Sequence, residues 1–208
     1  VINPHVFAKT GFDPVADFTP LTMVATTPSV LVAHPSLPVS NVKELIAYAK
    51  KRPGQLNFAI GGTGSSLHLA GEAFKMRAGV FIVNIPYRST APAITDVVGG
   101  NVPLMFAAVG NARQLIATGK LKALGVTSPK RLPQLPDVPA MAETLPGFES
   151  AAWFGLFGPA GLAPDVVKRL SDAARASVRS DAMRQRVEAD GGTVVGNDPA
   201  EFAAFVKA

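Results

Sequence analysis

Cysteine is absent from the 208-residue chain, and histidine is scarce. Without cysteine, disulfides, thiol catalysis and thiolate metal sites are excluded, while the redox compartment stays undecided. The three histidines, His5, His34 and His68, stand far apart, and none has a second histidine or a carboxylate cluster at metal-ligand spacing. We therefore expect no metal site, and nothing in the pattern requires a cofactor.

Long apolar runs and dense charge are missing as well. No apolar run approaches the roughly 18 residues needed to span a bilayer, so a transmembrane helix is not expected. Hydrophobic residues make up 48% of the chain and charged residues 17%, which is a globular composition. The net charge is +5, but the basic residues are scattered, apart from short groups at Lys50–Arg52 and Lys130–Arg131 beside prolines. This scatter argues against nucleic acid as a partner.

Short β-type runs alternate with helical patterns from Ser29 onward. The expected strands are residues 29–34, 56–60, 80–85, 102–107, 121–127 and 151–158, with a short edge strand in 192–196. Three helices are expected directly after a Ser40 cap, after a glycine-rich turn at 61–66 and after a Ser89 or Thr90 cap. Four more are expected at residues 111–118, 164–178, 181–189 and 199 to the end. Such alternation predicts an α/β fold whose mostly parallel sheet is covered on both faces.

The glycine-rich turn Gly61–Ser66, with the sequence GGTGSS, is the sharpest local feature. Small residues let the backbone approach a ligand closely, and the free N–H groups of a helix start attract anions. The turn lies where open α/β sheets bind ligands, at the carboxyl end of a strand. An anion cradle and a tight turn with a serine N-cap but no ligand both fit the pattern, and the residues alone leave both open.

Competing chemistries fit the same region poorly. The turn lacks the Gly-Lys-Ser/Thr ending of a P-loop and the spacing of a dinucleotide fingerprint. Ser65, Ser66 and His68 are close in sequence, with Asp96 further on, but no Gly-x-Ser-x-Gly elbow is present. On a helix, Ser66 and His68 point in different directions. We therefore expect His68 to bond to a nearby backbone group, and we expect no enzyme activity.

A series of motifs follows the order found in a known receptor family. The motifs are Ile2–His5, Asp13–Pro20, Pro53–Phe58, Gly62–Leu69, Ile85–Arg88, Ala123–Ser128, Leu135–Pro139, Trp153–Leu156 and Pro159–Gly161. In this order they extend over essentially the whole chain, which resembles the Bug-type receptors of tripartite tricarboxylate transport. The resemblance implies a periplasmic-binding-protein fold of the second type, with two α/β domains around a hinged cleft. It also implies a periplasmic receptor that captures a small carboxylate and delivers it to a membrane permease.

The resemblance also assigns the ligand-binding residues. In the family, a ligand carboxylate is held between two strand-to-helix turns, one from each domain. The residues that match the second-domain turn are Gly62, Thr63, Gly64, Ser65 and Ser66. The residues expected to line the rest of the cleft are Thr27, Ser29, Tyr87, Ala107 and Ala108. From the residues alone, Tyr87 at the end of a predicted strand fits a pocket or a rim or core position.

The same resemblance divides the chain into three parts. Residues 1–23 are expected to be a remnant of domain 1, residues 24–147 domain 2, and residues 148–208 the C-terminal part of domain 1. The first β-α-β region of the family, with the other carboxylate-binding turn, has no match in this sequence. We therefore expect an N-terminally truncated piece whose incomplete domain favours instability, association or swapped assembly.

The sequence leaves alternatives open both for the class of ligand and for the function. Many relatives have an aspartate where this chain has Ala107, which favours a simple dicarboxylate or an aromatic acid over an amino acid as the ligand. The alternative function is the effector-binding domain of a cytoplasmic transcriptional regulator, which has a related fold but follows a DNA-binding helix-turn-helix.

Overall fold

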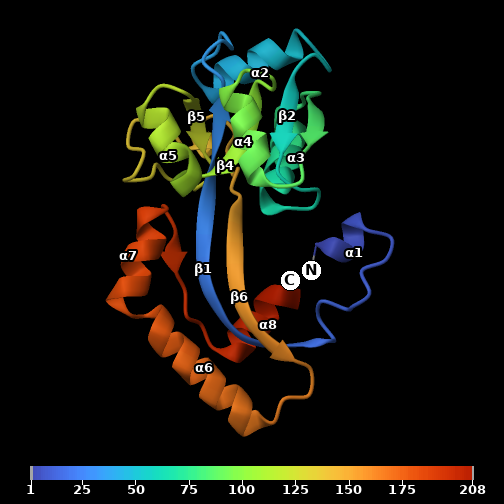
Figure 1. Ribbon diagram of the computed structural model, residues 1–208, viewed down its shortest axis with the longest axis vertical. Helices are drawn as coiled ribbons and strands as arrows, with labels where there is room; N and C mark the ends of the chain where they lie inside the picture. The colour runs from blue at the N-terminus through green and yellow to red at the C-terminus, as the bar shows by residue number, and fades with distance from the viewer. Residues whose placement is uncertain (1, 208) are drawn as a thin grey trace. The chain divides into compact units, whose positions relative to one another are not determined.

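The computed structural model describes residues 2–207, which form two compact units (Figure 1). The larger unit runs from Pro28 to Ala152, and the smaller unit combines the chain up to Thr27 with the chain from Trp153 on. Strands β1 (Phe18–Ala33) and β6 (Ala151–Pro159) each contain residues of both units. The chain therefore passes between the units along these two strands.

The sheet of the larger unit follows the strand order β3-β2-β4-β1-β5. Its further strands are β2 (Asn57–Ile60), β3 (Val83–Pro86), β4 (Leu104–Ala108) and β5 (Lys122–Val126). Strand β2 pairs in parallel with β3 and β4, whereas β1 runs antiparallel to β4 and β5. The predicted mostly parallel sheet is confirmed, and β1 is its antiparallel member in the part of the chain that the structure describes.

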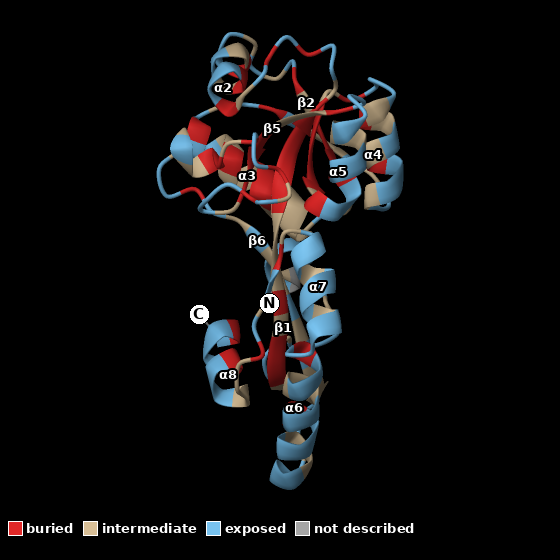
Figure 2. Cartoon of the chain, turned by 90° about the vertical axis from the view of Figure 1, so that its left-hand side faces the viewer, coloured by how far each residue is buried: buried red, intermediate tan, exposed pale blue. Residues whose placement is uncertain are grey.

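Four helices cover the two faces of this sheet. The helices are α2 (Val42–Lys50), α3 (Ser66–Ala78), α4 (Thr90–Val98) and α5 (Val109–Ala117). Successive strand residues alternate between two buried clusters: Leu31 packs with α2 and α3, and Val30 and Val32 pack with α4 and α5. Figure 2 shows the strands of this unit largely in the buried colour. Coverage on both faces, as predicted, is confirmed.

Several sequence-based boundaries need correction, including the helix predicted at 111–118, which is α5 at Val109–Ala117, and the strand predicted at 102–107, which is β4 at Leu104–Ala108. Strand β1 begins at Phe18, well before the predicted residue 29. The prediction was too short because Pro20 and Pro28 argue against a strand, although this strand contains both. Helix α2 is capped by Asn41, which accepts from the Glu44 N–H at 2.9 Å, and not by Ser40. Strand β3 starts at Val83, later than the predicted residue 80, because the chain is still leaving α3 there: the Val80 N–H bonds back to the carbonyl of Lys75.

The smaller unit joins the first half of β1 to β6, β7 (Thr193–Val194) and four helices. The helices are α1 (Asn3–Val6), α6 (Pro164–Val178), α7 (Asp181–Ala189) and α8 (Pro199–Lys207). The predicted bounds of α6 and α7 are confirmed. The core of this unit is small: its main cluster consists of buried Met23, Phe202 and Val206, with Trp153 and Phe157 packed against them. Among residues 2–207, no helix is long and apolar enough to cross a membrane.

Candidate functional site

Three strand-to-helix connections of the larger unit lie at one edge of its sheet (Figure 1). Strand β2 leads through the glycine-rich turn into α3, β3 leads into α4, and β4 leads directly into α5. Because β2 is parallel to both β3 and β4 and hydrogen-bonded to each, the carboxyl ends of the three strands are neighbours. This is the edge at which open α/β sheets bind ligands.

Close packing at Gly61 holds the turn against the start of α4. A Cβ atom at Gly61 would lie 2.7 Å from both the backbone nitrogen and the Cα of Thr90, so only glycine fits there. Gly62 and Gly64 have φ angles of 135° and 79°, which L side chains rarely adopt. The local sequence thus forces a tight turn whose first residue, Gly61, packs against the start of α4.

Some polar groups of the turn are hydrogen-bonded within the protein, and others are not. The Ser65 hydroxyl caps α3 by accepting the His68 N–H at 3.2 Å, and the Gly64 N–H donates to Nδ1 of His68 at 3.1 Å. The expected bond from His68 to a nearby backbone group is confirmed. Within residues 2–207, the N–H groups of Ser66 and Leu67 have no hydrogen-bond partner, as the first turn of a helix leaves them.

The first turns of these helices are distinctive in charge. Among the described helices of nine or more residues, α3, α4 and α5 have no acidic residue in their first turn, whereas α2, α6, α7 and α8 each have one. Within residues 2–207, no side chain caps α4 or α5, and the same is true of α6. An acidic residue at a helix start neutralises the positive end of the helix dipole. The three helices at the strand ends leave that end without a partner from their own first turns, which favours an external anion.

Behind the turn, α3 and β3 are joined by a polar network. Glu72 accepts from Lys75 Nζ at 2.7 Å and from the Asn84 amide, and Lys75 also donates to Asn84 Oδ1 at 3.3 Å. Desolvation pushes the pKa of Glu72 up, but hydrogen bonds from Lys75 and Asn84 outweigh it and hold that pKa below its usual value. His68 faces this network, with Nε2 at 3.1 Å from Asn84 Nδ2 and 3.4 Å from Glu72 Oε1.

Tyr87 follows β3, and its hydroxyl and ring both make contacts within the larger unit. Its hydroxyl donates to Asp96 Oδ2 of α4 at 2.7 Å, and its ring packs against the core cluster of α4 and α5. The hydrogen bond to Asp96, with some desolvation, raises the pKa of Tyr87 to about 12. The same bond, with one from Asn101, lowers the pKa of Asp96. The hydroxyl therefore fixes the ring beside α4.

The other predicted lining residues are less accessible. Ser29 is 6% exposed, and its N–H donates to Thr127 Oγ1 at 2.8 Å. Ala107 is fully buried in the core, so its side chain reaches no surface. Ala108 pairs with Ser29, is partly exposed and forms the N-cap of α5. Thr27 is partly exposed and is the last residue of the first segment of the smaller unit.

Sequence reasoning missed two parts of this edge. It identified Ser89 only as a helix cap and did not assign Thr90 or Val109, the first residues of α4 and α5, to the site. The signal was present in the sequence as the missing acids of three first turns. Thr127 was also missed: it is fully buried, and its hydroxyl bridges β1 to the carbonyl of Ser150.

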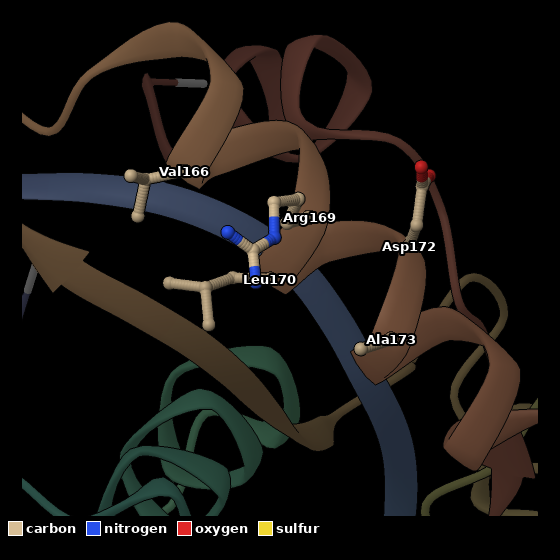
Figure 3. A pocket seen from close by; sticks show the side chains of 5 residues that line it. All are labelled: Val166, Arg169, Leu170, Asp172 and Ala173. Atoms are coloured by element: carbon tan, nitrogen blue, oxygen red, sulfur yellow. The ribbon is translucent and has the colours of Figure 1, made fainter.

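A hollow in the smaller unit offers a weaker alternative. It lies along one face of α6, lined by Val166, Arg169, Leu170, Asp172 and Ala173 (Figure 3). Asp172 is paired with Lys168 at 2.7 Å, so this carboxylate is already neutralised. The hollow is open and its polar groups do not converge. In the part of the chain that the structure describes, no group of three potential metal ligands occurs either.

Comparison with known proteins gives a family for the chain. The model of the "Tripartite tricarboxylate transporter family receptor" matches residues 1–208. Protein BugT of Bordetella pertussis is 35% identical over 191 residues, covering 91% of this chain and 59% of BugT. The chain spans about three-fifths of the length of BugT and of most other curated relatives it matches.

Solved structures of similar sequence share its fold. Rpa4515 of R. palustris with adipate has a TM-score of 0.89 and 34% identity, covering 97% of this chain and 68% of that one. MatC from Rhodopseudomonas palustris with bound malate has a TM-score of 0.88 and 30% identity, covering 99% and 71%. The expected family and the α/β periplasmic-binding-protein fold are confirmed.

Proposed function

Because the chain belongs to the tripartite tricarboxylate transporter receptor family, we propose that it captures a small carboxylate in the periplasm and delivers it to a membrane permease. Two solved relatives, one described as a periplasmic transporter and the other as the periplasmic binding protein BugD, support the location. Receptors of this kind bind their ligand and perform no chemistry on it. The absence of a nucleophile elbow around Ser65 and Ser66 agrees with that role.

The observation that carries the proposal is the set of three helix starts without acids at one sheet edge. The N–H groups of Ser66 and Leu67, together with the starts of α4 and α5, present partial positive charge where a carboxylate would sit. Gly62 and Gly64 keep the turn free of side chains that would block the approach. Thr63 is exposed, and we propose that its hydroxyl donates to the same anion.

The remaining predicted residues take graded roles in this proposal. Tyr87, Ala108 and Thr27 are partly exposed and are proposed as wall residues. Ser29 and Ala107 are buried, so we propose that they support the wall through packing and backbone bonds without touching the ligand. Ser65 acts through its cap on α3.

The proposed ligand is a simple dicarboxylate. Similar proteins were solved with adipate and with malate, which are both dicarboxylates. Ala107 presents no carboxylate to pair with a ligand amine. A dicarboxylate is therefore favoured over an amino acid, and an aromatic acid is the second candidate ligand.

Thermal unfolding against adipate, malate, benzoate and amino acids tests the function. A ligand at ~100 times its dissociation constant stabilises the folded state by about 2.7 kcal/mol. We expect such a shift with a dicarboxylate and none with adipamide, which has the same shape without the charge. The measurement is run on this chain and on a chain of its relatives' full length. A flat response of both chains to every acid would overturn the proposal.

A proline substitution tests the amide at the start of α3. Ser66→Pro deletes one N–H, and proline is well tolerated at the first helical position. The preceding Ser65 already has φ −68° and ψ 158°, which suit a residue before proline. We expect dicarboxylate affinity to fall about tenfold, while Ser66→Ala, which removes only the hydroxyl, has a smaller effect. Asp181→Pro, at the same position of α7 after Ser180, is the matched control and should leave affinity unchanged.

A further inference from the structure

We propose that His68 is a positioning residue, whose Nδ1 accepts the Gly64 N–H and so holds the glycine-rich turn in its anion-binding form. The inference rests on the proposed function and assigns a part of that site to a side chain that does not touch the ligand. The Gly64 N–H lies 3.1 Å from Nδ1, and the Ser65 hydroxyl holds the His68 backbone N–H at 3.2 Å. His68 is therefore bonded to the turn through both its side chain and its main chain.

The surroundings of His68 explain why the ring is fixed. Its side chain is 15% exposed, and its Nε2 edge is directed at Asn84 and Glu72. Asn84 comes from β3, whereas Glu72 comes from α3 itself. Lys75, also 15% exposed, clamps Glu72 and Asn84 and donates to the carbonyl of Ile82 at 3.2 Å. The ring thus links the turn to the strand-helix layer behind it.

The hydrogen bond at Nδ1 requires one tautomer of the ring. To accept from Gly64, Nδ1 must carry no proton, so the proton of the neutral ring lies on Nε2. In this tautomer the Glu72 carboxylate oxygen, 3.4 Å from Nε2, is the nearby acceptor, and the 3.1 Å approach of Nε2 to Asn84 Nδ2, which donates to Glu72, is a contact between two donors. We therefore infer that the ring accepts from the turn through Nδ1 and directs the proton on Nε2 toward Glu72. A doubly protonated ring would place an N–H against the Gly64 N–H and lose the contact.

Gly64 needs this acceptor because of its conformation. Its φ of 79° turns the backbone between Thr63 and the Ser65 cap, and the residue is partly buried. A partly buried N–H without an acceptor raises the free energy of the folded state. A turn that loses this acceptor is therefore expected to shift until the Gly64 N–H finds another partner. Since the amides of Ser66 and Leu67 follow directly, any movement at Gly64 misplaces the groups proposed to bind the anion.

Two conservative variants separate the two edges of the ring. The side-chain oxygen of His68→Asn lies close to the Nδ1 position and can still accept from Gly64, but it does not reach Glu72. His68→Gln reaches the Nε2 position and keeps the contact with the network, but it leaves Gly64 without its acceptor. We expect His68→Gln to weaken adipate or malate binding about tenfold, and His68→Asn to restore most of that affinity. Calorimetric titration with these two acids measures both.

A spectroscopic measurement reports on the bond directly. In ¹⁵N-labelled protein, the unprotonated Nδ1 of His68 and a ¹⁵N–¹⁵N coupling across the Gly64–His68 hydrogen bond are expected in the wild type. The Gly64 amide resonance should stay near its wild-type position in His68→Asn and move in His68→Gln. Melting temperatures of both variants show whether each remains folded.

The outcomes separate this inference from the proposed function. If the wild type binds a dicarboxylate and both variants bind equally well, the positioning role of His68 is wrong. Equal losses in both variants would also overturn it, because the Nδ1 edge would then have no special part. A protonated Nδ1 in the wild type contradicts it without any ligand. If the wild type binds no acid at all, the proposed function fails, and the nitrogen spectrum still tests the bond.

Discussion

The two compact units differ sharply in how much apolar surface they bury. In residues 2–207, thirty-five buried hydrophobic residues belong to the larger unit and six to the smaller unit. Exposed large hydrophobic side chains show the reverse: ten lie in the smaller unit and three in the larger. Figure 2 shows the exposed colour over most of α6 and α7. The larger unit has the core of a complete domain, and the smaller unit does not.

This difference teaches where the stability of the chain lies. Buried apolar area is the main favourable term in folding, so a unit with few buried side chains opens at a lower free-energy cost. The candidate anion site is built from α3, α4 and α5, which pack on the well-buried sheet. We therefore expect the turn to keep its geometry under conditions that already open the smaller unit.

Truncating one core phenylalanine in each unit is the strongest way to break this comparison. Phe58 and Phe202 are both almost fully buried, at 1% and 0% exposure. Phe58→Ala should lower the unfolding free energy of the larger unit by about 3–5 kcal/mol, because it removes the ring that packs against Phe74 and Phe106. Urea unfolding, followed by amide hydrogen exchange in β2 and β4, measures this loss.

Phe202→Ala should act differently although the side chain is the same. It removes the centre of the small cluster with Trp153 and Phe157, so amide protection in α8 and β7 should fall. Protection in β2 and β4 should stay close to wild type. Phe81→Ala, at a residue that is 63% exposed, is the control and should change neither unit by more than about 0.5 kcal/mol. Equal loss of protection in both units after Phe202→Ala would show that they unfold together.

A glycine substitution tests the rigidity of the site within the stable unit. In Gly61→Ala the new methyl group meets the backbone of Thr90 at 2.7 Å, so the turn or α4 must shift. We expect a loss of about 1–3 kcal/mol in unfolding free energy and a clear loss of dicarboxylate affinity. Gly99→Ala is the matched control, because its φ of −75° suits alanine and its nearest contact would be 3.4 Å. A wild-type affinity in Gly61→Ala would show that this close contact does not shape the site.

The sequence could predict much of the fold because its signals are local. Strands and helices of the larger unit carry apolar runs and caps at the right spacing, and the GGTGSS turn was identified between its strand and helix. The bond of His68 to a nearby backbone group could also be anticipated, because a histidine three residues after a serine cap lies close to the turn. These features depend on neighbours within a few residues.

What could not be predicted depends on partners far apart in the chain. Ser29 was expected to line a ligand site, but its N–H is taken by Thr127, 98 residues away. Ala107 was expected at the same wall, and the alternation of β4 turns it into the core. The link of His68 to Asn84 arises only because β3 packs beside α3. No local sequence pattern around these residues predicts which distant residue each one contacts.

The smallest expected effect comes from Tyr87, at the outer part of the stable unit. Tyr87→Phe removes the hydrogen bond to Asp96 and should cost at most about 1 kcal/mol at neutral pH. Because the folded-state pKa of Tyr87 is raised to about 12 from an ordinary value of 10, the stabilisation is complete below pH 10 and is lost as the pH rises toward 12. Urea unfolding of wild type and variant between pH 8 and pH 11 measures the difference. If the gap between them stays constant across that range, the hydroxyl does not titrate as the Asp96 bond requires, and α4 is held by packing alone.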